Sequence, residues 1–284
     1  MKLPRPADIM QWHDPVGAAI PLVFDSPHSG RVYPEDFRYA CDFDRLRQAE
    51  DSYVDELFAA APKLGATLIA AQFPRSYIDA NRSALDIDES LLATPWTGPM
   101  APSEKTRLGL GLIWRLIGPN LSVYDRKLPV SEVRHRIEHY HTPYHAALDA
   151  VTDAMHRRFG VVWHINCHSM PGLSSALSAE GPGIPRADFV LGDRDGSTCA
   201  PELTTFVAAV LSGLGYHVRI NEPYKGVELV RRHGRPAEHR HSLQIEVNRR
   251  LYMDEITFEK LPEFGKVQGD IATLIAELAR FARH

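Results

Sequence analysis

A short apolar run that ends in polar residues, one of them a histidine, is the feature that most constrains this fold. Residues 161–170 read VVWHINCHSM, with β-branched and apolar residues up to Ile165, followed by Asn166-Cys167-His168-Ser169. A run of this length predicts a buried strand. Open α/β sheets bind ligands at the carboxyl ends of their strands. His168 is therefore a candidate site residue, although a core or capping histidine is the alternative.

A second histidine follows another predicted strand. Residues 18–25 (AAIPLVFD) form an apolar run that stops at Ser26-Pro27-His28-Ser29-Gly30. Pro27 cannot donate to a sheet ladder and Gly30 permits a tight turn, so we expect the strand to break here. This places His28 at a strand end, as for His168. The alternative is that His28 only caps the turn.

The remaining pattern alternates strands with helices. Up to about residue 15 we expect an irregular lead-in, and at 231–241 a charged loop. Further strands are predicted at 66–72, 108–117, 188–191, 216–220 and 242–247, and helices at 44–62, 131–159 with a kink near Pro143, 201–214 and 265–280. This alternation predicts one α/β domain, residues 1–284, with helices on both faces of a mainly parallel or mixed sheet. Glycines and prolines in residues 84–125 predict a long excursion over the mouth of the site.

Composition excludes several classes of function. The net charge is −4, so no basic footprint suggests nucleic acid, and no apolar stretch is long enough to cross a bilayer. The N-terminal residues contain no apolar segment typical of a signal peptide. Cys41, Cys167 and Cys199 form no CxxC pair, which favours a reducing cytoplasm. We expect a small-molecule substrate; the oligomeric state is not predicted.

Two histidines at strand ends and a nearby acid would make a catalytic metal site. Such zinc sites use three protein ligands and a water molecule. The predicted ligands are His28, Asp51 and His168, because Asp51 shares a side of its predicted helix with Val54 and Phe58 and can point inward. The other acids of that helix remain alternatives to Asp51, namely Glu50 and Asp55.

Glu246 is the candidate general base. It lies near the end of the apolar strand predicted at 242–247, where a buried carboxylate is costly unless it has a role. The base would take a proton from the attacking water and pass it to the leaving nitrogen. The alternative is that Glu246 forms a buried structural ion pair with Arg249 or another arginine.

Residues that follow the strand at 66–72 suggest an anion site. Arg75, Asn81 and Arg82 lie within eight positions of one another, and the fork of arginine suits carboxylates. Surface charges are the alternative. On the long helix, His135, His139 and His141 are expected to be exposed, whereas Tyr144-His145 follows Pro143 and could face the site.

Taken together and in order, these stretches resemble the N-formylglutamate amidohydrolase family over roughly residues 20–255. The matching stretches are Ser26-Pro27-His28-Ser29-Gly30, residues 51–57, Arg75 with Ile78-Asp79-Ala80-Asn81-Arg82, Pro143-Tyr144-His145, Asn166-Cys167-His168-Ser169-Met170, Asn221-Glu222-Pro223-Tyr224-Lys225-Gly226, and Ile245-Glu246-Val247-Asn248-Arg249 with Leu251-Tyr252-Met253. The resemblance implies a fold like that of zinc carboxypeptidases, a three-layer α/β/α sandwich around a mixed sheet.

The resemblance also implies roles for these residues. Zn²⁺ or another divalent ion would be held by His28, an acid and His168, with Glu246 as the base. Asn81-Arg82, helped by Arg75, would bind the α-carboxylate of the substrate. One departure concerns the acid, because zinc carboxypeptidases usually offer His-x-x-Glu and here Arg31 stands at that spacing from His28.

The implied reaction is hydrolysis of N-formyl-L-glutamate to formate and L-glutamate, the last step of one histidine-degradation route. Arg75 would stabilise the oxyanion, and Arg249, Lys225 or Arg231 would anchor the second carboxylate. Two alternatives remain open: another N-acyl amino acid amidohydrolase or carboxypeptidase-like peptidase, and a non-catalytic binding protein on the same scaffold.

Overall fold

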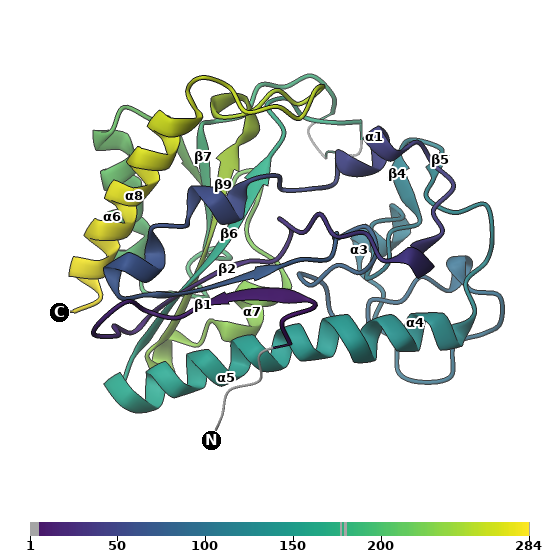
Figure 1. The fold of residues 1–284 in the computed structure, drawn as a ribbon, viewed down its shortest axis with the longest axis horizontal. Coiled ribbons are helices and arrows are strands. Elements are labelled where there is room, and N and C mark those ends of the chain that lie inside the picture. Colours follow the sequence, from purple (N-terminus) through teal and green to yellow (C-terminus); the bar gives the residue numbers. More distant parts are fainter. Residues whose placement is uncertain (1–5, 177, 179–180, 284) are drawn as a thin grey trace.

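A seven-stranded mixed sheet forms the centre of the molecule (Figure 1). The computed structural model describes residues 6–176, 178 and 181–283. The strand order is β1-β3-β2-β6-β9-β7-β8. The strands of this sheet are β1 (Met10–His13), β2 (Leu22–Ser26), β3 (Thr67–Ala71), β6 (Val162–Met170), β7 (Phe189–Gly192), β8 (Val218–Ile220) and β9 (Arg240–Asn248). A separate pair, β4 (Leu116–Gly118) and β5 (Leu121–Ser122), lies outside it.

The central strands are parallel, as the sequence pattern predicts. β3, β2, β6 and β9 run in one direction, β1 pairs antiparallel with β3, and β7 pairs antiparallel with β9. β8 is parallel to β7 at the other edge. In the β6–β9 register His168 lies directly beside Glu246. The carboxyl ends of β2, β6 and β9 therefore meet at one edge of the sheet.

Helices cover both faces of the sheet, which confirms the predicted layers. α5 contacts β2 and β6 on one face, where α7 also packs on β6 and β9. On the other face α2 packs on β6, α6 on β7, and α8 on α2 and α6. Figure 1 shows α6 and α8 side by side, apart from α5. The helices are α1 (Phe43–Arg47), α2 (Val54–Leu57), α3 (Glu104–Arg107), α4 (Val130–Arg136), α5 (Thr142–Phe159), α6 (Pro201–Gly213), α7 (Glu228–His233) and α8 (Phe264–Phe281).

Three local predictions are wrong. The lead-in predicted up to about residue 15 is not irregular throughout, because β1 pairs with β3; residues 1–5 lie outside the described residues. The charged loop predicted at 231–241 is shorter, because α7 extends into its start and β9 begins before its end. The helix predicted at 44–62 is interrupted between α1 and α2, where the amide of Asp51 donates to the carbonyl of His28 (3.0 Å) and Tyr53 adopts φ 67°. Tertiary bonding to the chain after β2 therefore overrides the local helical pattern.

The long helix near Pro143 is continuous with a local change of pitch. α4 is followed by a π-helical turn, Ile137–His141, which leads directly into α5. Pro143 has no N–H to donate to the preceding turn of this continuous helix, and the π-helical turn stands directly before it. A π turn, a feature often found at functional sites, stands at the position where the sequence predicts a kink.

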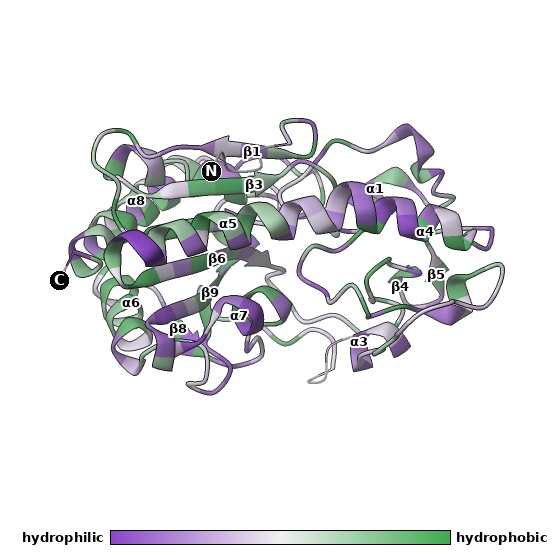
Figure 2. Cartoon of the chain, turned by 90° about the horizontal axis from the view of Figure 1, so that it is seen from below, coloured by the Kyte–Doolittle hydropathy of each residue, from purple (hydrophilic) through white to green (hydrophobic). Residues whose placement is uncertain are grey.

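The excursion at residues 84–125 has little regular structure. The strand predicted at 108–117 is wrong except for its last two residues, which belong to β4 of the β4–β5 pair. The excursion carries α3, β4 and β5 and lies beside α4 at one end of the molecule in both ribbon views (Figures 1 and 2). Its central part contacts the segment that follows β3, because the amide of Asp79 donates to the carbonyl of Leu112 (2.8 Å).

β6 extends further than its apolar run suggests. It continues to Met170, so His168 lies inside the strand rather than after it. Because side chains alternate across a strand, His164, Asn166 and His168 share one face, which packs against α5 and α7. The intervening Ile165 and Cys167 belong to the apolar cluster on the other face. The sheet is thus polar on one face of its central strands.

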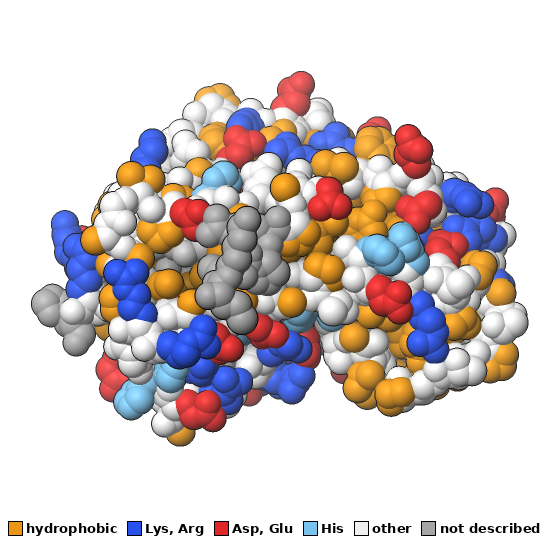
Figure 3. All heavy atoms as spheres, turned by 60° about the horizontal axis from the view of Figure 1, so that its bottom comes forward, with side chains coloured by type: hydrophobic (Ala, Val, Ile, Leu, Met, Phe, Trp, Pro, Cys, Tyr) orange, Lys and Arg blue, Asp and Glu red, His pale blue; other side chains and the backbone are white. Residues whose placement is uncertain are grey.

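The visible surface carries charges of both signs. On the face shown in Figure 3, acidic and basic side chains lie next to one another. Among the described residues, no helix is both long enough and apolar enough to span a membrane.

Gly30 supports the strand end that presents His28, but not through the conformational freedom of a turn. A Cβ added at Gly30 would lie 2.2 Å from the carbonyl oxygen of Phe73 and 2.4 Å from the carbonyl carbon of Gln72. Both are backbone atoms, so the two segments would have to separate. We predict that Gly30→Ala destabilises the protein by about 1–3 kcal/mol, the range for overpacking, as measured by urea unfolding.

Gly269 offers a matched control within α8. A Cβ at this position would meet nothing within 4 Å. Gly269→Ala should stabilise the protein by about 0.5–1 kcal/mol through helix propensity. If Gly30→Ala were as stable as the unsubstituted protein, the close approach at Gly30 would have no role in the fold.

Candidate metal centre and active site

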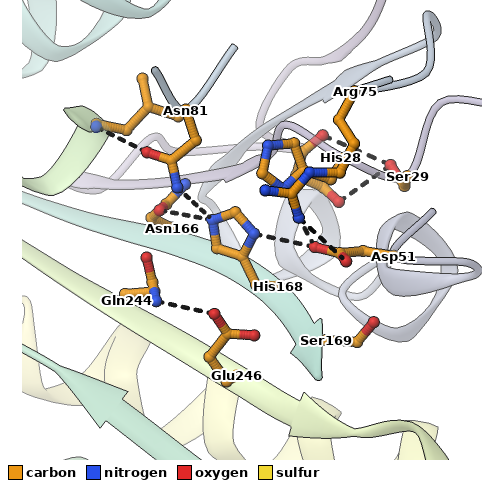
Figure 4. A network of polar contacts seen from close by, with 12 residues as sticks. His28, Ser29, Asp51, Arg75, Asn81, Asn166, His168, Ser169, Gln244 and Glu246 are labelled. Atoms are coloured by element: carbon orange, nitrogen blue, oxygen red, sulfur yellow. Dashed lines mark hydrogen bonds and ion pairs between the residues drawn. The ribbon is translucent and has the colours of Figure 1, made fainter. Parts of the chain in front are cut away.

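Three side chains from distant parts of the chain converge at the carboxyl ends of the central strands (Figure 4). His28, Asp51 and His168 are all buried, and one potential ligand atom from each lies within 4.8 Å of the others. Oδ2 of Asp51 lies 3.0 Å from Nδ1 of His168 and 3.4 Å from Nδ1 of His28. The centroids of the two imidazole rings are 4.7 Å apart. The geometry brings together the three ligands that the sequence predicts.

Asp51, rather than its neighbours, is the acid of this cluster. Glu50 is also buried, but it accepts hydrogen bonds from Tyr33 (2.7 Å) and Ser52 (3.0 Å). Asp55 lies in α2. Among the described residues the group that could hold a metal ion is His28, Asp51 and His168. The turn between α1 and α2 is what directs Asp51 inward.

The donor set fits a divalent cation. Nε2 of His28 contacts Oδ1 of Asp79 (2.7 Å), so this nitrogen carries the proton and Nδ1 presents a lone pair. Nδ1 of His28 is buried and has no hydrogen-bond partner in the part of the chain that the structure describes. A buried polar atom without a partner is costly unless a ligand satisfies it. Two imidazole nitrogens and a carboxylate are typical ligands of catalytic zinc.

The buried Arg249 and the partly buried Arg75 balance the two carboxylates of the site. Arg249 donates to Oδ1 of Asp51 (3.0 Å), and Arg75 donates to Oδ2 of Asp79 through Nη2 (3.0 Å). Burial alone would raise the pKa of Asp51, but the hydrogen bond with His168, the nearby imidazole of His28 and the charge of Arg75 hold this pKa well below its usual range. Burial would also raise the pKa of Asp79, but Arg75 and His28 hold this pKa well below its usual range. Both acids are therefore ionised at neutral pH.

Glu246 has the opposite electrostatic environment. Its side chain lies beside His168 on the neighbouring strand, and Oε1 accepts a hydrogen bond from Gln244 (2.9 Å; Figure 4). Burial and the nearby carboxylate of Asp51 raise the pKa of Glu246 well above its usual range. A carboxylate whose proton affinity is raised in this way is suited to accept and return a proton.

Two of the predicted anion-binding residues line the same site. Arg75 lies over the ring of Trp114, 5.0 Å from its centroid. Nε of Arg82 donates to the carbonyl of Leu110 (3.1 Å). Within the described residues, no hydrogen bond engages the two terminal nitrogens of Arg82, so they are available to a ligand. Leu110 and Trp114 come from the excursion, which therefore does border the site.

The other predicted substrate-binding residues each make hydrogen bonds to other protein groups. The side-chain amide of Asn81 spans Leu229 N (2.9 Å) and Nε2 of His168 (3.1 Å). Nε2 of His145 donates to the carbonyl of Ala80 (2.8 Å). The remaining three contact acids: Tyr144 donates to Asp25 (2.8 Å), Arg249 to Asp51, and the exposed Lys225 to Asp195 (2.9 Å).

Sequence reasoning did not assign roles to Asp79, Asn166 or Asp25. Asp79 orients His28, and Asn166 contacts Nε2 of His168 through Oδ1 (2.8 Å). Asp25 accepts from Asn166 (2.8 Å) and is fully buried. A signal was present in β6, where polar residues recur at every second position of an apolar strand.

Comparisons with known proteins point to one family. The family model described as N-formylglutamate amidohydrolase matches residues 20–253. N-formylglutamate deformylases of Pseudomonas putida and Pseudomonas aeruginosa are each 28% identical, over 241 and 239 residues, with 83% of this chain and 83% of each relative covered. The crystal structure of N-formylglutamate amidohydrolase from Ralstonia eutropha JMP134 is 50% identical, with a TM-score of 0.93 and coverage of 97% of this chain and 98% of that chain.

A more distant solved structure shares the fold. The crystal structure of a gene product from Agrobacterium tumefaciens is 18% identical, with a TM-score of 0.69, and the alignment covers 97% of this chain and 94% of that chain.

Substitution of Asp51 tests the third ligand. We predict that Asp51→Asn lowers the affinity for Zn²⁺ by more than about 100-fold, because loss of an outer partner of a ligand alone typically costs 10–100-fold. Affinity would be measured by competition with a chromophoric chelator. Glu50→Gln is the control and should bind the metal as the unsubstituted protein does. The reverse pattern would assign the metal to Glu50.

Proposed function

The chain belongs to the N-formylglutamate amidohydrolase family, and from this premise we propose that it hydrolyses N-formyl-L-glutamate to formate and L-glutamate with a divalent metal ion. The observation that carries the proposal is the buried cluster of His28, Asp51 and His168 with Glu246 beside it. Zinc is the proposed metal because its catalytic sites use these ligand types.

The metal would supply the electrophilic part of the chemistry. When bound, a divalent ion lowers the pKa of a water molecule toward neutrality and polarises a carbonyl oxygen. Asp79 fixes the ring of His28 through Nε2, and Arg249 fixes the carboxylate of Asp51. Such outer contacts orient the ligands and are part of the site.

Glu246 is the proposed general base and acid. It would accept a proton from the attacking water while the water oxygen bonds to the formyl carbon. It would then return that proton to the nitrogen as the C–N bond breaks, so that formate and the free amine of glutamate leave. The raised pKa of Glu246, caused by burial and by Asp51, supports both transfers because the carboxyl group can hold the proton between them.

The arginines are assigned to the negative charges of the reaction. Arg75, which is partly accessible beside Asp51 and Asp79, is proposed to stabilise the oxyanion. Arg82, with Asn81 next to it, is proposed to bind the α-carboxylate through its terminal nitrogens. A guanidinium fork is suited to bidentate recognition of a carboxylate.

The second carboxylate of the substrate needs a further cation. Lys225 and Arg231 are exposed and pair with Asp195 and Glu228. Arg249 is buried at the metal centre. Of the three candidates Arg249 is the one that contacts the cluster, and we assign the side-chain carboxylate to it. Its nitrogens already donate to Ser169, Gln48 and Asp51, so the substrate would be bound by the second hydrogen of a terminal nitrogen.

The wider setting is part of the same proposal. We place the reaction at the end of a histidine-degradation route in the cytoplasm, performed by residues 1–284 as a single amidohydrolase domain. The match of the family model over residues 20–253 supports one functional unit. Three free thiols, Cys41, Cys167 and Cys199, are compatible with a reducing compartment.

Glu246→Gln separates metal binding from proton transfer. We predict that this variant retains its metal and loses turnover by about 10²–10⁴-fold, the usual contribution of a general base. Formate release from N-formyl-L-glutamate and metal content would be measured on one sample. Undiminished formate release by the Gln variant would remove Glu246 from the mechanism.

Arg82→Leu tests carboxylate recognition. A hydrogen bond to a charged group contributes about 1.5–3 kcal/mol, so KM for N-formyl-L-glutamate should rise about 10–150-fold at unchanged metal content. The control is Arg219→Leu, because Arg219 is an exposed arginine that pairs with Glu222. A KM in Arg82→Leu equal to that of the unsubstituted protein would contradict the assignment. In the unsubstituted protein, faster cleavage of acetyl or peptidyl substrates than of N-formyl-L-glutamate would contradict formylglutamate as the substrate.

A further inference from the structure

We infer that Asn166, held in place by the buried carboxylate of Asp25, positions His168 so that its Nδ1 is available as a metal ligand. The inference rests on the proposed metal site and adds two positioning residues to it. Neither Asn166 nor Asp25 touches the cluster atoms of His28 or Asp51 in the hydrogen bonds of the structure. Their effect is transmitted through one nitrogen, Nε2 of His168.

Nε2 of His168 has two polar neighbours of opposite character. Oδ1 of Asn166 lies 2.8 Å away and Nδ2 of Asn81 lies 3.1 Å away. An amide oxygen only accepts and an amide nitrogen only donates, so the two neighbours favour different tautomers of the ring. When Nδ1 binds a metal, Nε2 must carry the proton, and Asn166 supplies the acceptor for it.

The amide of Asn81 cannot rotate freely to become an acceptor. Its Oδ1 accepts a hydrogen bond from the amide of Leu229 at the start of α7 (2.9 Å), which turns Nδ2 toward His168. Without the oxygen of Asn166, the remaining neighbour of Nε2 would therefore be a donor. The favoured proton position would shift to Nδ1, which faces Asp51 at 3.0 Å and is the ligand atom.

Asp25 fixes which way the amide of Asn166 points. Nδ2 of Asn166 donates to Oδ1 of Asp25 (2.8 Å), and both residues are fully buried. Rotation of this amide would place its oxygen against the carboxylate, an arrangement of two acceptors without a proton. The orientation that presents Oδ1 to His168 is thus the one that Asp25 permits.

Asp25 is in turn held as a carboxylate by two further donors. Tyr144 donates to Oδ2 (2.8 Å), and His164 contacts Oδ1 through Nε2 (2.8 Å), with its Nδ1 on Ser242 (2.7 Å). Burial would raise the pKa of Asp25, but these hydrogen bonds and the one from Asn166 lower it below its usual value. β2 and β6 pair Asp25 with Asn166 in register, so the sheet itself sets this contact.

Asn166→Leu tests the inference on the full-length protein. We expect its affinity for Zn²⁺, measured by chelator competition, to fall about 10–100-fold, the range for loss of an outer partner of a metal ligand. A second readout is the Nε2–H proton of His168 in ¹H–¹⁵N spectra of the zinc-loaded protein. It should move upfield and exchange faster with water, because its acceptor is gone.

Ser242→Ala is the matched control within the same buried cluster. It removes one buried hydrogen bond, the contact with His164, and leaves Asn166 and Asp25 in place. It should lower the melting temperature in the way Asn166→Leu does, while zinc affinity and the Nε2–H resonance stay as in the unsubstituted protein. An equal loss of affinity in both variants would mean that the cluster is merely structural, which would overturn the inference.

An exchange of the two side chains provides a rescue. In the double variant Asp25→Asn/Asn166→Asp, the amide at 25 can donate to the carboxylate at 166, which still accepts the proton of His168. We expect the double variant to regain most of the zinc affinity lost in Asn166→Leu. A folded double variant that binds zinc as weakly as Asn166→Leu would contradict the inference. If Asn166→Leu does not fold, the zinc affinity of the double variant, compared with that of the unsubstituted protein, decides the question.

Two further outcomes separate this inference from the proposed function. If the unsubstituted protein binds zinc and Asn166→Leu binds it equally tightly with an unchanged Nε2–H resonance, only the positioning role is overturned. If the unsubstituted protein binds no divalent ion, the proposed metal dependence and this inference are overturned together.

Discussion

The compensation of the buried carboxylate of Asp51 is the interaction on which the rest of the site depends. A carboxylate removed from water is strongly destabilising unless charges and hydrogen bonds replace the lost hydration. Here Oδ2 faces His28 and His168, and Oδ1 faces Arg249. The same contacts draw together the carboxyl ends of β2, β6 and β9 and the turn between α1 and α2. The metal centre and the local fold are thus stabilised by one set of atoms.

The sheet supplies the second constraint, because it carries polar side chains on one face of its central strands. His168 and Glu246 are neighbours in the β6–β9 register, and Asp25 and Asn166 are neighbours in the β2–β6 register. Polar groups buried in this way are tolerated when they are hydrogen-bonded to one another. The opposite face is apolar and packs against α2, α6 and α8. The fold therefore confines its chemistry to one side of the sheet.

The environments of the three acids in the site shift their pKa values in opposite directions. Asp51 and Asp79 are held ionised by histidines and arginines, whereas burial and the charge of Asp51 raise the proton affinity of Glu246. When two carboxylates have pKa values shifted in opposite directions, one commonly stabilises charge and the other transfers a proton. This separation agrees with the metal and base roles that we propose for them.

The sequence by itself determined the alternating α/β pattern, the strand that ends before His28, and the strands that carry His168 and Glu246, because these follow from hydrophobic periodicity and turn residues close in the chain. Only the tertiary structure decided that the segment around Asp51 leaves the helix, that β1 joins the sheet, and that Asp79, Asn166 and Asp25 surround the histidines. Each depends on partners far apart in the chain, such as the 51 positions between His28 and Asp79. Local pattern carries no information about such contacts, since their free energy arises only when the sheet brings the partners together.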